Sequence, residues 1–506
     1  MVAFIAEASV PSGMDAGARS MHVVMLPWLA FGHILPFTEL AKRIARHGHR
    51  VTLLSTPRNT RRLIGDVPPD LASLLRVTDV QLPRVDGLPE AAEATVDLPS
   101  DDLRPLLRRA FDAAFAAALS EALREPAPRR PDWVLIDYAA YWAPAAAAAH
   151  GVPCAFLSLF SAAALGFIGP PEALMGAGGK HAKTKPEHFT AVPDYVPFPT
   201  TVAFRGYEAR EKLKPAGLAH HDGPGVSEAY RFGKSIEGSR LVGIRSSAAF
   251  EPEWLRLLGE LYRKPVIPLG LLPPPRPTTQ GAAVAGHEAT LRWLDGQAPG
   301  SVVYVAFGSE AKLSSAQLRA VALGLEASGL PFLWAFRAAP ATASAATAGE
   351  DVDATTGLPA GFEERVTGGR GLVCRGWVPQ VRLLAHGSVG GFLTHAGWNS
   401  VVEGLALGVR LALLPLMFDQ GLNARHLVEK KIGVEVARDE EDGSFGAQDV
   451  ADALRRVMAE DDDGGEDGYG AKVKELAEVF GNEEANDQCL RDFLRRLSED
   501  TMQREG

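Results

Sequence analysis

Short, almost continuous apolar runs that alternate with helical repeats constrain the fold of this chain more than any other feature. The first run is His22–Trp28, and the next is Arg50–Thr56. Between them, Pro36 opens a helical repeat that ends before Gly48, with apolar residues at Phe37, Leu40, Ala41, Ile44 and Ala45. A continuous apolar run is typical of a strand buried on both faces, and the strand–helix–strand order favours a parallel sheet. The residues therefore predict an α/β fold with a first helix that begins at Pro36.

The same alternation occurs in both halves of the chain. Further apolar runs of the first half are Trp133–Asp137, Pro153–Leu159, Arg240–Ser246 and Pro265–Gly270. Those of the second half are Ser301–Ser309, Pro331–Arg337, Gly371–Trp377, Val389–His395 and Arg410–Leu416. A segment rich in Pro, Gly and Ala, residues 271–286, lies between the two series and is typical of a linker. We therefore expect two doubly wound α/β domains, with ligands in a cleft at the carboxyl ends of the strands.

Composition argues against several classes of function. Of the 506 residues, 46% are hydrophobic and 23% are charged, as in a soluble globular protein. The net charge of −10 argues against nucleic acid or an anionic membrane as the main partner. Three distant cysteines predict neither a disulfide framework nor a metal cluster, and no apolar run approaches the length of a transmembrane span. We expect a cytoplasmic protein, with solvated loops at Ala338–Gly357 and Glu460–Gly470.

The stretch LTHAGWNSVVEG predicts a phosphate-binding turn. It has the pattern of a strand, a turn with glycine, and a helix that begins near Asn399 and Ser400. The free amides and the positive dipole at the start of a helix favour an anion. His395, Asn399 and Ser400 add side-chain donors, so a diphosphate can be bound here without Lys, Arg or metal.

Polar and aromatic residues around this turn suit the rest of a nucleotide sugar. Trp377 offers a flat face on which a base can stack, and Glu403 lies one helical turn beyond Ser400, where it can accept hydrogen bonds from ribose hydroxyls. Asp419 and Gln420, at the end of the next predicted strand, suit the hydroxyls of a sugar. A plain structural interpretation stays open for two of them, since Trp377 can be a core aromatic and Glu403 a surface charge.

The residues from Trp377 to Gln420 resemble the signature segment of the plant UDP-dependent glycosyltransferases. The match includes WVPQ, FLTHAGWNS, EG, PL and the closing DQ. The stretches FGHILPF and VLIDYAAYW fall where that family carries its catalytic base and the partner acid, so the resemblance extends over nearly the whole chain. It implies a GT-B fold of two facing Rossmann-like domains and an inverting transferase. It also implies a UDP-sugar as co-substrate, a small-molecule acceptor, no cofactor and no metal.

On that architecture we expect a monomer with five successive parts. They are a disordered lead-in at 1–20, an N-terminal acceptor-binding domain at 21–270, the linker at 271–286, a C-terminal UDP-sugar-binding domain at 287–480, and a C-terminal helix and tail at 481–506. The last part can pack back on the N-terminal domain.

The resemblance also implies which residues bind the donor, and a terminal Gln in this segment favours glucose without excluding rhamnose. Those residues are Trp377 for uracil; Gln380 and Glu403 for the ribose; His395, Asn399 and Ser400 for the diphosphate; Trp398, Asp419 and Gln420 for the transferred sugar; Gly308 and Ser309 for a further phosphate-side loop; and Val378 and Gly397 within the same motif.

Two residues depart from the family pattern. Ala396 stands where Cys is usual, and we expect this change to be harmless. Arg410 stands where Pro is usual, just before the strand that leads to Asp419, so it can alter how that loop is set.

His33 and Asp137 are the expected catalytic residues. Each follows a predicted strand, and the two positions match the base and the partner acid of the family. Histidine suits proton abstraction from an alcohol because its unperturbed pKa is about 6.5. Asp137 would hold the tautomer of the ring and stabilise the imidazolium. The structural alternatives are a satisfied histidine that only packs, and an Asp137 that caps the following helix.

Three other motifs carry little weight. The acidic triplet Asp351–Asp353 resembles the metal-binding triplet of other glycosyltransferases, but it lies in a low-complexity loop. The stretch Gly176–Lys180 lacks the spacing and the Ser or Thr of a P-loop. The first strand is followed by FGH rather than G-x-G-x-x-G, which argues against a dinucleotide oxidoreductase.

The acceptor is expected to bind in the region between Phe160 and Arg240, which is partly apolar and partly basic. The stretches STPRN, VDGLPE and DGSF resemble the branch of the family that extends a sugar already attached to a terpenoid or flavonoid. The alternatives are an aglycone O-glucosyltransferase, a UDP-sugar epimerase on the same scaffold, and a binder without catalysis.

Overall fold

The computed structural model describes residues 20–126, 129–176, 181–214, 218, 226–277, 286–337, 357–366, 369–459 and 469–505. Most of the predicted lead-in, the middle of the predicted linker and nearly all of the two predicted loops lie outside these ranges. The triplet Asp351–Asp353 and most of the stretch Gly176–Lys180 lie outside them as well.

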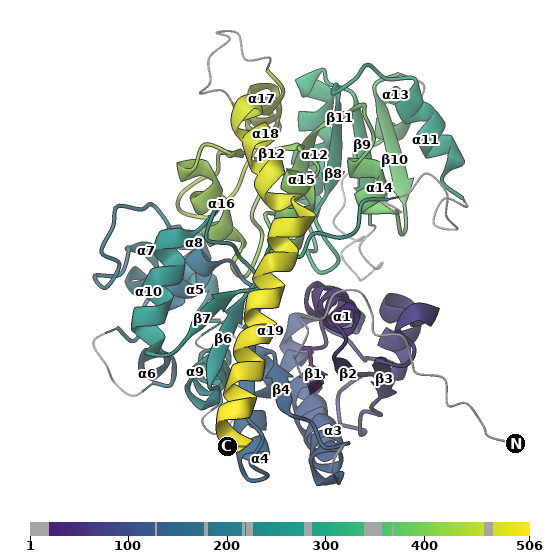
Figure 1. Cartoon of the computed structure of the whole chain (residues 1–506). Coiled ribbons are helices and arrows are strands. Elements are labelled where there is room, and N and C mark those ends of the chain that lie inside the picture. The colour runs from purple at the N-terminus through teal and green to yellow at the C-terminus, as the bar shows by residue number, and fades with distance from the viewer. Residues whose placement is uncertain are drawn as a thin grey trace, which may run out of the picture.

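Two parallel sheets organise the described chain (Figure 1). The first has the order β3-β2-β1-β4-β5-β6-β7, and its strands are β1 (His22–Leu26), β2 (Arg50–Ser55), β3 (Leu75–Asp79), β4 (Trp133–Ile136), β5 (Cys154–Ser158), β6 (Leu241–Ile244) and β7 (Val266–Pro268). The second has the order β10-β9-β8-β11-β12-β13, and its strands are β8 (Val302–Ala306), β9 (Phe332–Phe336), β10 (Gly371–Arg375), β11 (Val389–Thr394), β12 (Arg410–Leu413) and β13 (Gly433–Glu435). The predicted fold class is confirmed.

The sequence patterns did not reveal β3 and β13, which lie at the edges of the two sheets. β3 is only partly buried and β13 has three residues. A short or half-buried strand lacks the continuous apolar run by which a central parallel strand is recognised.

Helices cover both faces of each sheet. Those of the first half are α1 (Phe31–Arg46), α2 (Pro57–Asn59), α3 (Arg104–Arg124), α4 (Ala143–Ala148), α5 (Ala162–Ile168), α6 (Pro171–Leu174), α7 (Glu187–Thr190), α8 (Gly206–Glu211), α9 (Glu228–Gly238) and α10 (Pro252–Tyr262). Those of the second half are α11 (Glu288–Asp295), α12 (Ser315–Ser328), α13 (Phe362–Val366), α14 (Gln380–Leu384), α15 (Trp398–Ala406), α16 (Gln420–Glu429), α17 (Ala447–Met458), α18 (Tyr469–Phe480) and α19 (Glu483–Glu505). Short turns of helix include η3 (Thr95–Asp97), η4 (Asp101–Leu103) and η5 (Tyr138–Ala140).

The first helix begins at Phe31, not at Pro36 as predicted, so His33 lies in its first turn. A proline lacks the N–H that would bond the carbonyl four residues earlier, which is why it usually marks a helix start. Here that carbonyl belongs to Gly32, and it accepts a hydrogen bond of 3.1 Å from Asn399 Nδ2 in the second half of the chain. A tertiary contact therefore replaces the missing helical bond.

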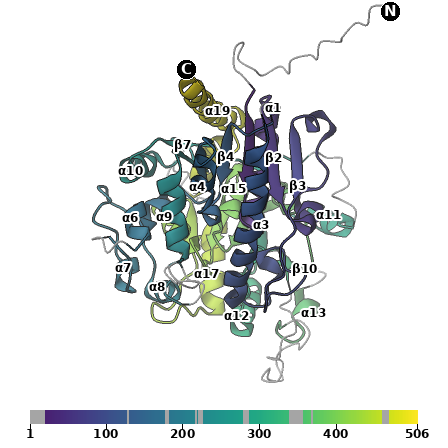
Figure 2. The same cartoon turned by 90° about the horizontal axis from the view of Figure 1, so that it is seen from below.

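The long helix α19 runs from the second half of the chain back along the first sheet (Figure 1). Its side chains Leu490, Phe493 and Leu494 are buried in the same cluster as those of α1. The indole of Trp133 in β4 donates to Thr501 Oγ1 at 2.9 Å. Seen from below, α1 and α19 lie on one side of the first sheet, and α3 and α9 lie on the other (Figure 2).

None of the helices within the described ranges is both long and apolar enough to cross a membrane.

Candidate active site

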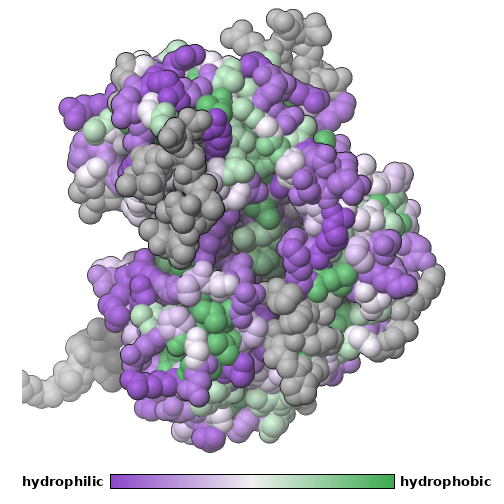
Figure 3. Space-filling view, turned by 180° about the vertical axis from the view of Figure 1, so that it is seen from behind, coloured by the Kyte–Doolittle hydropathy of each residue, from purple (hydrophilic) through white to green (hydrophobic). Residues whose placement is uncertain are grey.

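A cleft of about 1140 Å³ lies between the two halves of the chain, at the carboxyl ends of central strands of both sheets. The space-filling view shows a hollow between the two lobes, with apolar surface inside it and polar surface around its rim (Figure 3). Of the residues predicted for the site, all but Asp137 line this cleft. Asp137 lies directly behind His33, with only 1% of its side chain exposed.

His33 and Asp137 form a direct hydrogen bond of 2.6 Å between Nδ1 and Oδ2. The pairing of β1 with β4 sets Leu26 opposite Ile136, so the residues that follow the two strands emerge at the same edge of the sheet. Because an ionised carboxylate can only accept, the ring carries its proton on Nδ1 and leaves the lone pair of Nε2 unused by Asp137. His33 lines the cleft with 16% of its side chain exposed, so this geometry suits a base.

Asp137 also orders the backbone around it. Its Oδ2 accepts a second hydrogen bond from Trp28 N at 3.1 Å, and its Oδ1 accepts one from Tyr138 N at 2.7 Å, which caps η5. Asp137 therefore caps η5 with Oδ1 and bonds to His33 with Oδ2, so the two interpretations of this residue do not exclude each other.

The pKa of His33 is raised above its usual value near 6.5. Burial alone lowers the pKa of a histidine, but the charge of Asp137 and its hydrogen bond outweigh that effect here. The carboxylates of Glu310 and Asp419 raise it further, so both lie close enough to act on the ring.

The start of α15 has the geometry that was predicted for an anion site. Its N-cap is Gly397, and no side chain caps the first turn. The backbone N–H groups of Trp398, Asn399 and Ser400 therefore have no side-chain acceptor, and these residues line the cleft. This geometry favours a phosphate through the free amides and the helix dipole.

The His395 ring lies between two glycines of this site. A Cβ atom at Gly308 would lie 2.7 Å from His395 Nε2, and one at Gly397 would lie 2.5 Å from the same atom. Both positions therefore have to lack a side chain. Burial lowers the pKa of His395 to about 4, so the ring is neutral at physiological pH and contributes a dipole rather than a charge.

One arginine stands directly behind the anion site, although the sequence had suggested a site without Lys or Arg. Arg245 follows β6, is buried, and donates to Asn399 Oδ1 and to the carbonyl of Leu271. Burial lowers its pKa to about 10, so it keeps its charge at neutral pH. The strand-end rule that pointed to His33 would also have pointed to Arg245.

Gln380 and Glu403 form a hydrogen-bonded pair, with Gln380 Nε2 donating to Glu403 Oε2 at 2.6 Å. Trp377 is 67% exposed, so the interpretation of this residue as a core aromatic does not apply. Trp377, Val378 and this pair line the cleft, where a flat ring and two polar side chains suit a nucleoside.

Trp398 packs between the cleft and the core. Its indole is buried, donates to the carbonyl of Arg245 at 3.0 Å, and packs near Phe250 and Phe480. The ring is therefore packed in the core, where the neighbouring half of the chain supplies the acceptor for the indole N–H. Trp398 also lines the cleft, and its contact with the transferred sugar stays a prediction.

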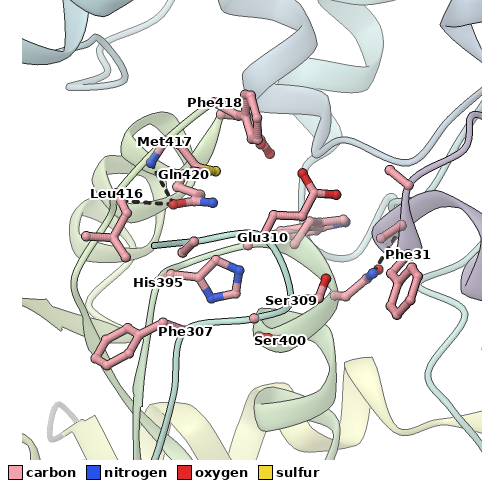
Figure 4. A pocket seen from close by; sticks show the side chains of 18 of the residues that line it. Phe31, Phe307, Ser309, Glu310, His395, Ser400, Leu416, Met417, Phe418 and Gln420 are labelled. Carbon is pink, nitrogen blue, oxygen red and sulfur yellow. Dashed lines mark hydrogen bonds between the residues drawn. The ribbon is translucent and has the colours of Figure 1, made fainter. Parts of the chain in front are cut away.

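Gln420 holds the loop that precedes α16. Its Oε1 accepts hydrogen bonds from the backbone N–H groups of Leu416 and Met417, both at 2.9 Å (Figure 4). This leaves the two N–H groups of the amide for a ligand. The Asp419 carboxylate accepts a hydrogen bond of 2.8 Å from Asn423, and burial raises its pKa.

The two departures from the family pattern have separate structural settings. Ala396 has a left-handed backbone with a φ of 62°, which costs a non-glycine residue about 1–2 kcal/mol. Arg410 begins β12 and donates to the carbonyls of Gly390 and Ala459, at the opposite end of the strand from Asp419. Its side chain therefore does not reach the loop that we expected it to alter.

Aromatic rings form the wall of the cleft next to His33. The ring centroids of Tyr138 and Phe160 each lie 5.8 Å from that of His33, and Phe232 stacks on Tyr138 at 4.4 Å. This wall suits an apolar acceptor. Among the described residues, no group of three or more His, Cys, Asp or Glu side chains is placed to hold a metal ion.

The chain is similar to known proteins over almost its whole length. Residues 290–463 match the family model described as "UDP-glucoronosyl and UDP-glucosyl transferase". UDP-glycosyltransferase 91C1 of Arabidopsis thaliana is 43% identical over 95% of this chain and 97% of its own length. Soyasaponin III rhamnosyltransferase of Glycine max is 36% identical over 97% of this chain and 98% of its own. Among solved structures, Glycyrrhiza uralensis UGT73P12 matches with a TM-score of 0.75 and 24% identity, over 96% of this chain and 97% of that one.

Proposed function

The chain belongs to the plant UDP-glycosyltransferases, and from this premise we propose that it transfers glucose from UDP-glucose to a hydroxyl of a sugar already attached to a terpenoid or flavonoid. The observation that carries the proposal is the His33–Asp137 pair, which leaves a basic nitrogen at the wall of a cleft whose other side holds the anion site.

The proposed reaction is a single displacement. His33 Nε2 takes the proton of the acceptor hydroxyl while its oxygen forms a bond to the anomeric carbon. The bond from that carbon to the phosphate oxygen breaks, and UDP leaves with its new charge at the start of α15. Asp137 stabilises the imidazolium. One displacement inverts the anomeric carbon, so an α-linked UDP-sugar yields a β-glycoside.

The donor sugar in this proposal is glucose, since Gln420 presents its amide N–H groups toward the sugar position. The relative from Glycine max is named as a rhamnosyltransferase, so UDP-rhamnose is the donor to compare.

Replacing Gln420 by Glu should test this assignment. A glutamate keeps an oxygen for the amides of Leu416 and Met417 but replaces the outward N–H groups with a second acceptor. We expect kcat/KM for UDP-glucose to fall about tenfold, the size of a lost hydrogen bond, and the preference over UDP-rhamnose to change. The acceptor preference should stay the same. The matched control is Gln448→Glu on α17, which should alter neither the donor preference nor the acceptor preference. An unchanged donor preference in Gln420→Glu would show that Gln420 does not select the donor sugar.

A glycoside acceptor is supported by the two kinds of surface in the cleft. The aromatic wall around Tyr138 and Phe160 suits an apolar scaffold, while Glu310, Arg104 and Asp419 supply polar partners in the same space. The name of the Glycine max relative denotes transfer to a saponin, which is itself a glycoside. We also propose a cytoplasmic monomer, in keeping with three cysteines that are all free.

The first test is UDP release from UDP-glucose by the purified protein. The assay is run without an acceptor, with diterpenoid and flavonoid glucosides, and with their aglycones. Release that requires a glucoside supports the proposal. Release only with aglycones would keep the enzyme class and make it an aglycone O-glucosyltransferase. Release with UDP-rhamnose alone would reassign the donor. Conversion of the UDP-sugar without any acceptor would favour an epimerase. The absence of any conversion would favour a binder without catalysis.

A further inference from the structure

We propose that Glu310, together with Arg104, forms a subsite that binds hydroxyls of the sugar carried by the acceptor. This inference rests on the proposed function and assigns the recognition of the acceptor sugar to a side chain of the C-terminal half of the chain. It makes Glu310 a specificity-determining residue of the reaction.

The position of Glu310 follows from the loop that carries it. The residue comes directly after Gly308 and Ser309, beyond the end of β8, and it lines the cleft that His33 also lines. Figure 4 shows its carboxylate extending away from Ser309 into the space between Phe31 and Phe418. Glu310 and His33 line the same cleft, and the charge of Glu310 raises the pKa of the His33 ring.

Residues of the N-terminal half hold this carboxylate. Thr95 donates to Oε1 at 2.7 Å, and Arg104 Nη2 donates to Oε2 at 2.9 Å. Each carboxylate oxygen has about two acceptor sites, so each keeps one for a ligand. The side chain is 18% exposed, so it is fixed in direction and still open to the cleft.

Arg104 completes the subsite. Its guanidinium also pairs with Asp101 at 3.0 Å and lies over the ring of Phe418, 4.5 Å from the centroid. The positive charge of Arg104, which Glu310 shares with Asp101, weakens the repulsion between the Glu310 carboxylate and a diphosphate bound near Ser309. A sugar hydroxyl that reaches His33 brings its neighbouring hydroxyls toward these groups, where a charged acceptor forms the stronger kind of hydrogen bond. An aglycone lacks these sugar hydroxyls.

The test compares Glu310→Gln and Glu310→Ala with the wild type. Each protein is assayed at saturating UDP-glucose with a flavonol 3-O-glucoside and with the matching flavonol. We expect KM for the glucoside to rise about tenfold with Gln and up to about a hundredfold with Ala, as for a lost hydrogen bond to a charged group. KM for UDP-glucose and the inhibition constant of the flavonol, measured as a competitor of the glucoside, should change less than about threefold, within the scatter of such measurements.

A matched control is Glu326→Gln, since Glu326 also pairs with an arginine, Arg365, but lies on α12 outside the cleft. This control variant should change neither KM for the glucoside nor the binding of the flavonol. Equal losses of affinity for the glucoside and for the flavonol, or a rise in KM for UDP-glucose alone, would overturn the subsite while leaving the proposed function intact. A wild-type protein that consumes only the flavonol would overturn the proposed acceptor itself. The wild type alone gives that result, so it is distinguished from a failure of the subsite. Thermal melting of each variant excludes loss of the fold as the cause.

Discussion

Replacing His33 by Ala should lower kcat by about a hundredfold to ten-thousandfold with every acceptor, which is the usual contribution of a general base. The affinity for UDP should change little, because the groups expected to bind UDP are other residues, the start of α15 and the Gln380–Glu403 pair. Single-turnover kinetics measure the rate of the chemical step, and calorimetry measures the affinity for UDP, so the two effects are separated.

The chain offers a matched control in His47, which also pairs with an aspartate, Asp487, at 2.7 Å, but does not line the cleft. His47→Ala should leave turnover unchanged. Retention of more than about a tenth of the activity by His33→Ala would contradict its role as the base. A parallel loss of UDP affinity would instead indicate a structural role.

Replacing Asp137 by Asn should lower kcat by about a hundredfold or more and move the pH dependence. The carboxylate accepts from three donors: His33 Nδ1, Trp28 N and Tyr138 N. An amide has only one oxygen, so its NH2 group must face at least one of these donors. If that donor is His33, the ring must accept at Nδ1 and carry its proton on Nε2, where it cannot act as a base.

The sign of the pH effect follows from the pKa of His33. Only the neutral ring takes a proton, so activity of the wild type should rise with pH through a value above 6.5, the usual pKa of histidine. Asp137→Asn removes the largest influence that raises this pKa, so the rise should move to lower pH while the plateau falls. Measurement of kcat/KM between about pH 5 and 9 tests this expectation.

The control is Asp487→Asn, which removes the carboxylate beside His47 and should leave the pH profile unchanged. A lower plateau in Asp137→Asn with an unmoved rise would show that another group sets the pH dependence. Asp137 would then be important for the backbone of Trp28 and Tyr138 rather than for the base.

Features whose chemistry is local in the chain could be predicted from the sequence. The central strands are apolar runs of a few residues, and the helix start at Trp398 to Ser400 presents amides of consecutive residues that suit an anion. The donor class was implied by the resemblance of the segment Trp377–Gln420 to the family signature. The edge strands β3 and β13 were missed because half-buried or very short strands leave no such pattern.

The tertiary structure alone decided the contacts between residues that are far apart in the chain. Asn399 replaces the bond that Pro36 cannot make to Gly32, which allows α1 to begin five residues earlier than its proline suggests. The indole of Trp398 turns into the core because the carbonyl of Arg245 lies there.

The charged groups of the cleft follow the same rule. Arg104 and Thr95 meet Glu310 across the two halves of the chain, and no periodicity of either segment indicates that meeting. The sequence by itself determined which elements form and what the helix start at α15 can bind, since these depend on neighbours along the chain. Only the docking of the two sheets decided which side chains face each other across the cleft, because side-chain hydrogen bonds and ion pairs require proximity in space.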